Sequence, residues 1–205
     1  MTSLPEPATA PARPASVATD LALVASFAAF IAVCAVLPAI PVGALPVPIT
    51  LQTFGVAVTG AVLGARRGFL ATALYVVVGL AGAPIFAGAT GGLATIAKPS
   101  FGYLLAFPLA ALLTGWLAEK VFRSRRWSHG PRAWLGVFGA TTAGSLLVIH
   151  PLGIAVLGWR LGLGPAEAIT AGLVFIPGDL LKNALAAFVA TAVHRAFPDL
   201  ISGRR

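Results

Sequence analysis

The chain has 205 residues and a net charge of +8, with 58% hydrophobic and only 10% charged residues. An average soluble domain carries about 25% charged residues, so this composition predicts a membrane protein with several spans. A transmembrane β-barrel is disfavoured because the apolar stretches approach the roughly 20 residues of a spanning helix and lack the alternation of barrel strands.

The N-terminal part of the chain predicts a tail followed by three spans. Residues 1–20 are rich in Pro, Ala, Ser and Thr, and we expect a disordered tail there. The first span covers about 21–40, and its length favours a retained helix over a cleaved signal peptide. Spans at about 50–65 and 68–83 are joined by the short hairpin sequence ARRG.

The second half of the chain predicts three more spans, at about 101–118, 134–158 and 168–195. The Gly- and Pro-rich residues 84–100 form a long outer loop between the third and fourth spans. Pro151 and Gly153 predict a kink in the fifth span, and Pro177 with Gly178 predicts a break in the sixth. Weakened helices of this kind recur at solute sites in transporters.

The predicted fold is therefore an all-α domain of six transmembrane helices over 21–197, followed by a basic tail over 198–205. With both termini in the cytoplasm, the basic residues of two inner loops and the two tails lie on one side of the plasma membrane, as the positive-inside rule requires. This distribution explains the net charge without a nucleic-acid ligand. The residues are Arg13, Arg66, Arg67, Lys120, Arg123, Arg125, Arg126, Arg132, Arg195, Arg204 and Arg205.

Few side chains are suited to metal or redox chemistry. Cys34 is the sole cysteine, which excludes an intramolecular disulfide and a cysteine metal cluster. Of three histidines, His129 lies in a basic loop and His194 near the C-terminus, so we expect His150 to be the only buried imidazole. We therefore expect neither a metal site nor a cofactor.

The sixth span carries an acid and a base inside an apolar sequence. Unpaired charges are costly in hydrocarbon and mark functional sites. Asp179 and Lys182 share a helix face, with Asn183 one position further, so the face offers an acceptor, a charged donor and an amide. It suits a urea-like ring. The alternative is an ion pair that only locks two helices together.

Other polar and aromatic candidates lie near the predicted outer side. Lys98 and Arg160 are outer-loop cations that would anchor an anionic tail, or else are simply solvated charges. Gln52, flanked by Thr50 and Thr53, would line a pocket, although capping of a helix is an equal alternative for Thr50. The aromatic candidates for an apolar ring system, which are alternatively interface anchors, are Phe86, Trp159 and Tyr103.

The first span carries alanines four residues apart, Ala25 with Ala29 and Ala28 with Ala32. Small residues at this spacing allow close approach of another helix, either from a partner or from the same chain.

Five ordered motifs resemble the BioY family, the biotin-specific substrate-capture subunits of energy-coupling-factor (ECF) transporters. The resemblance covers nearly all of residues 38–190. The motifs are PVPITLQT, ARRG, LYVVVGLAGAPIFAGATGG, KPSFGYLLAFPLAA and IPGDLLKNALAA. One departure is Lys98, which stands where a small residue is expected.

The resemblance implies a six-helix S component that binds biotin near its outer face without catalysis, beneath outer loops that close over it. It implies that Asp179 and Lys182 contact the vitamin and that the AxxxA face meets a coupling protein. ECF coupling and ATPase subunits, or further copies of the chain, are the implied partners. The alternatives are a capture subunit for another small vitamin, a membrane enzyme using Asp179, Lys182 or His150, and a structural packing protein.

Overall fold

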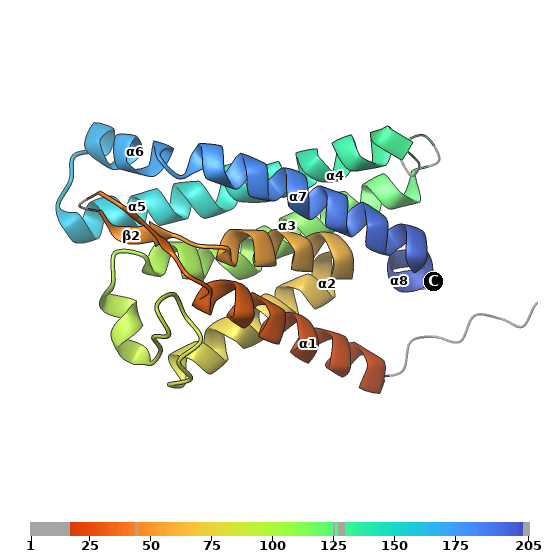
Figure 1. Ribbon diagram of the computed structural model, residues 1–205, viewed down its shortest axis with the longest axis horizontal. Coiled ribbons are helices and arrows are strands. Elements are labelled where there is room, and N and C mark those ends of the chain that lie inside the picture. The colour runs from red at the N-terminus through yellow and green to blue at the C-terminus, as the bar shows by residue number, and fades with distance from the viewer. Residues whose placement is uncertain (1–16, 44, 125, 127–129, 203–205) are drawn as a thin grey trace, which may run out of the picture.

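The computed structural model describes residues 17–202 except 44, 125 and 127–129 (Figure 1). Within this part, five helical segments are long and apolar enough to cross a membrane. They lie beside one another as a bundle, with the remaining elements at its ends. The segments are Val17–Val36, Gln52–Leu80, Phe101–Arg123, Gly130–Leu161 and Ile176–Ala196.

Helix α1 (Val17–Val36) leads into a short β-hairpin that the sequence analysis does not predict. Strand β1 (Ile40–Val42) pairs antiparallel with β2 (Leu45–Ile49). Prolines at 46 and 48 favour an extended backbone over a helix, and in a two-stranded hairpin their missing N–H groups are tolerated. Among the described residues this hairpin is the only β-sheet, and the other regular elements are helices.

The structure describes only part of each predicted tail, and in that part it differs from the prediction. Helix α1 begins at Val17 rather than near residue 21, and residues 1–16 of the predicted tail lie outside the described residues. At the other end, the short helix α8 (Asp199–Ser202) occupies part of the predicted basic tail, and residues 203–205 are outside the description.

Helix α2 (Gln52–Leu80) is two helical arms that meet at Gly64, where φ is 78° and ψ is −177°. A side chain is strained in this conformation, so glycine permits the reversal visible in Figure 1. The arms correspond to the predicted second and third spans. They pack on α3 (Phe101–Arg123), where a Cβ at Gly115 would overlap the backbone at the bend.

The fifth predicted span is a continuous helical segment from 130 to 161 with a π-helical turn inside it. Helix α4 (Gly130–Gly144) is followed by the π-helix η2 (Ser145–Ile149) and by α5 (His150–Leu161). The irregularity therefore lies in the turn before Pro151. Proline has no N–H to donate to the preceding turn, which disrupts the regular helical hydrogen bonding there.

The sixth predicted span is divided into α6 (Pro165–Leu173) and α7 (Ile176–Ala196). The break falls at Val174 and Phe175, just before the predicted position. Pro177 instead lies in the first turn of α7, where its fixed φ suits a helix start. Asp179 belongs to the same first turn.

The bundle has two distinct ends (Figure 1). At one end, α1 begins, α2 bends, α3 gives way to α4, and α7 ends. The buried Arg67 side chain pairs there with Asp20 of α1 and donates to the Leu200 carbonyl of α8. The opposite end carries the β-hairpin, the 81–100 loop with the 3-10 helix η1 (Leu93–Ala97), and the α5–α6 junction.

A candidate binding site for a small molecule

A cavity of about 220 Å³ lies at the end of the bundle that carries the β-hairpin and the 81–100 loop. Five segments line it: the hairpin, the start of α2, the 81–100 loop, the start of α3 and the α6–α7 junction. Its lining is mainly apolar with a few polar groups, as is typical of sites for small molecules. A volume of this size suits a small molecule.

The polar group of the cavity is centred on Asp179, which is 4% exposed. Its Oδ1 accepts hydrogen bonds from Lys182 Nζ and from Thr53 Oγ1, both at 2.8 Å. Lys182 Nζ also donates to Thr53 Oγ1 at 3.2 Å, which closes a triangle between α7 and α2. The predicted acid–base pair is therefore formed, but it faces the cavity rather than a sealed interior.

The second oxygen of the carboxylate faces α5. His150 Nε2 lies 3.1 Å from Asp179 Oδ2, although it does not align as a hydrogen bond requires. Sequence reasoning left His150 out of the predicted site because contacts between α5 and α7 are not encoded in local spacing. Within the described residues no three His, Cys, Asp or Glu side chains gather as a metal site would need.

A chain of hydrogen bonds fixes one aromatic wall of the cavity. Gln52 Nε2 donates to Tyr75 Oη at 2.5 Å, and that hydroxyl donates to the Ile85 carbonyl at 3.1 Å. Tyr75 meets Phe86 edge to face, with 5.4 Å between ring centroids. Gln52 and Phe86 both line the cavity, and Gln52 also positions the loop that carries Phe86 through Tyr75.

Tyr103 and Lys98 complete the set of predicted residues that the fold brings together. Tyr103 lines the cavity from α3, and its ring contacts that of Phe175 edge to face at 6.0 Å. Lys98 lines the cavity from the loop after η1, with Nζ donating to Thr90 Oγ1 at 3.1 Å. The hydroxyl of Tyr103 is buried without a hydrogen-bond partner.

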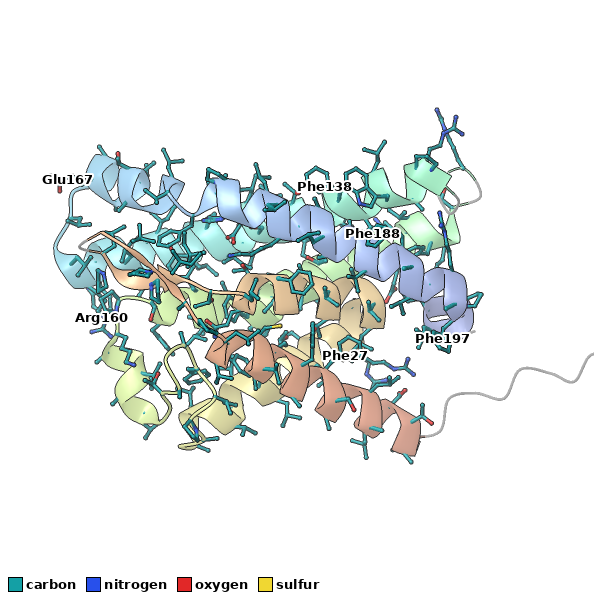
Figure 2. All side chains as sticks on the ribbon, viewed as in Figure 1. Phe27, Phe138, Arg160, Glu167, Phe188 and Phe197 are labelled. Carbon is teal, nitrogen blue, oxygen red and sulfur yellow. The ribbon has the colours of Figure 1, made fainter. Side chains whose placement is uncertain are left out.

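Three other predicted site residues do not line this cavity. Asn183 is buried, and its backbone carbonyl accepts a hydrogen bond from Thr141 of α4. Arg160 is at the α5–α6 end of the molecule (Figure 2), where it donates to the Ile96 carbonyl at 3.0 Å. Its guanidinium covers the ring of Trp159, which is 72% exposed.

The alanines of α1 lie on two different faces. Ala28 is buried and Ala32 packs against the core, so this pair serves contacts within the chain. Ala25 and Ala29 are exposed. No described residue of α1 lines the cavity.

Comparison with known proteins gives a consistent set of relatives. The model of the BioY family matches residues 6–199. The biotin transporter BioY of Rhizobium etli is 38% identical over 184 residues, which are 88% of this chain and 96% of the relative. The biotin transporter BioY of Rhodobacter capsulatus is 37% identical over 196 residues, which are 90% of this chain and 98% of that protein.

The fold also has a solved counterpart. A crystal structure of the S-component for biotin from an ECF-type ABC transporter matches with a TM-score of 0.79 at 28% sequence identity. The match covers 87% of this chain and 92% of that chain.

Thr53 provides a test of the polar triangle in the absence of any ligand. In Thr53→Val, Asp179 and Lys182 each lose a hydrogen-bond partner, whereas Thr53→Ser keeps the hydroxyl. We expect the valine variant to lose about 1–3 kcal/mol of stability and the serine variant to stay near the wild type. Thermal unfolding in detergent measures this. Equal melting temperatures for the valine variant and the wild type would contradict the arrangement.

Proposed function

Because the chain belongs to the BioY family, we propose that it captures biotin in the cavity around Asp179. The protein is a biotin transport protein of the S-component type and not an enzyme. The observation that carries the proposed site is a buried carboxylate and ammonium that both face a cavity otherwise lined mainly by apolar groups. Such a pair meets a neutral ligand with hydrogen-bonding groups of both kinds.

The ureido ring of biotin fits this polar cluster. It has two N–H donors and one carbonyl acceptor, while Asp179 provides acceptor sites and Lys182 a charged donor. A carboxylate has about four lone-pair sites, and the two donors on Oδ1 leave others for the ligand. The opposite charges of Asp179 and Lys182 balance, which suits the uncharged ureido group.

The fused thioether ring of biotin is apolar and requires an apolar wall. We place it against Phe86, Tyr103 and Phe175, which line the same cavity from the loop, α3 and the α6–α7 junction. Trp159 lies outside this cavity, so Phe86 is the better of the two ring partners considered from the sequence. Asn183, whose side-chain nitrogen is buried without a partner, is not among the residues that line the cavity.

The carboxylate tail of biotin requires a cation, and Lys98 is the candidate that lines the cavity. Its ammonium donates to the hydroxyl of Thr90 rather than to a carboxylate. The ammonium has three N–H groups, and those that Thr90 does not use are suited to bind a carboxylate. Arg160 is directed to a backbone carbonyl outside the cavity and is not assigned this role.

The topology that we propose has six crossings, with each arm of α2 counted as one. The end of the bundle where α2 bends and α7 ends then faces the cytoplasm, because the basic residues of the inner loops belong to these segments. The cavity opens toward the outer side. Biotin therefore enters from outside, as capture requires, and both termini are cytoplasmic.

We propose that the exposed face of α1 around Ala25 and Ala29 receives a coupling protein. Small side chains allow the close helix approach that drives association in lipid, and the chain carries no nucleotide motif of its own. ATP hydrolysis by partner subunits would then supply the energy for release.

Asp179→Asn removes the charge that we place on the ureido ring while keeping its size. We expect the affinity for biotin to fall at least tenfold, because an amide offers only one acceptor oxygen and leaves Lys182 without its counter-ion. Equilibrium binding of radiolabelled biotin to the purified protein measures this. Glu167→Gln, at an exposed acid outside the cavity, is the matched control. Undiminished binding by Asp179→Asn would exclude the assigned role.

Lys98→Gln tests the tail contact, with Arg160→Gln as its control. We expect Lys98→Gln to weaken biotin binding several-fold and to leave the binding of biotin methyl ester unchanged, because the ester has no charge to pair with the ammonium. Arg160→Gln should bind both compounds as the wild type does. The assignment fails if Arg160→Gln reproduces the selective loss and Lys98→Gln does not.

Replacement of Ala29 by Leu tests the α1 face, with Ala192→Leu on an exposed face of α7 as its control. In cells that supply ECF coupling and ATPase subunits, we expect Ala29→Leu to reduce biotin uptake while the purified variant still binds biotin. Uptake equal to wild type, with or without those subunits, would remove the proposed interface. If Ala29→Leu instead abolishes self-association of the purified protein, the partner of this face is a second copy of the chain.

A further inference from the structure

We infer that His150 is a positioning residue of the biotin site, which holds the Asp179 carboxylate from the side opposite Lys182. The inference rests on the proposed function, since it assigns a role toward the same ligand. No motif singles out this histidine, and it does not line the cavity around Asp179.

The burial of His150 is the first observation. The side chain is 3% exposed, and neither Nδ1 nor Nε2 has a hydrogen-bond partner. Nearly all buried polar groups in proteins are paired, so an imidazole with two unpaired nitrogens requires an explanation. The polar atom beside it is Asp179 Oδ2, at 3.1 Å from Nε2.

The second observation is that the two oxygens of the Asp179 carboxylate have different neighbours. Oδ1 receives Lys182 from α7 and Thr53 from α2, whereas Oδ2 lies on the other side, 3.1 Å from His150 Nε2. A small rotation of the imidazole would place its Nε2–H in line with Oδ2. Three donors from three different helices would then fix the plane of the carboxylate, and with it the direction of the remaining lone pair, which would meet a ureido N–H group.

The local sequence explains how His150 reaches this place. The π-helix η2 ends directly before it, and the His150 N–H donates to the carbonyl of Ser145, five residues earlier. Such π-helical turns are frequent at functional sites. One turn further, Gly153 has no side chain, and a Cβ there would overlap the Tyr103 ring. Tyr103 therefore packs against α5 and meets His150 edge to face at 6.5 Å.

The surroundings on the other side of the imidazole are apolar. His150 lines a second cavity, together with Leu146, Ile154, Ala168 and Ile176 of the helices around it. The lining of that cavity includes no carboxylate or cationic side chain to pair with the free nitrogen. A leucine at position 150 has about the size of the imidazole but no donor, so packing and hydrogen bonding can be separated by substitution.

The experiment compares His150→Leu, His150→Gln and His150→Asn. The amide nitrogen of Gln reaches the position of Nε2, that of Asn falls short of it, and Leu has no donor. We expect Leu and Asn to weaken biotin binding at least tenfold and Gln to stay within about threefold of the wild type. Biotin methyl ester should follow the same order, because the effect belongs to the ureido end.

Thermal unfolding shows which variants are folded, and equilibrium binding of radiolabelled biotin gives the affinities. A residue that only fills space would give equal affinities for Gln and Asn, which would overturn the inference, as would wild-type affinity in the Leu variant. If Leu fails to fold, the Gln and Asn variants decide alone. Failure of the wild-type protein to bind biotin would instead refute the proposed function and this inference with it.

Discussion

The structure depends on one buried carboxylate, that of Asp179. An unpaired charge at this depth is costly in an apolar bundle, and the fold meets that cost with donors drawn from separate helices: Lys182 from α7 itself and Thr53 from α2. The break before α7 places the acid in a first turn, where a helix N-terminus favours a negative charge. The π-helical turn brings His150 of α5 against the opposite oxygen. Several irregularities in otherwise regular helices therefore converge on one side chain.

The cavity is lined both by the ends of helices and by the β-hairpin and the 81–100 loop. The β-hairpin and the 81–100 loop cover the polar cluster, and they are joined to the helices by specific side chains. Gln52 at the start of α2 reaches Tyr75 near its end, and Tyr75 in turn holds the backbone at Ile85 beside Phe86. The hydrogen bond between Gln52 and Tyr75 also links the two arms that meet at Gly64. The bend and the aromatic wall are thus parts of the same arrangement.

Much of the helical order and the central pair were predictable from the sequence, whereas the partners of that pair were not. Asp179 and Lys182 are identifiable because charges are costly in an apolar helix and their spacing places them on one face. Thr53 contacts Asp179 across 126 positions of sequence, and only tertiary packing establishes such a contact. The same limit applies to Asn183 and Trp159, because helical periodicity does not say which of two neighbouring faces meets the cavity. The β-hairpin was missed because its prolines predict a loop as readily as a strand.

Along the chain, helix α1 is connected to the cavity through the β-hairpin that follows it. None of its described residues lines the cavity, yet the chain passes from Val36 within a few residues into the hairpin that does. At its far end the helix is fastened through Asp20 to Arg67 beside the bend of α2. A neighbouring protein that tilts α1 about this fixed point would move the hairpin that lines the cavity without itself reaching the cavity. Helix α1 thus connects an exposed helix face with the hairpin that lines the cavity.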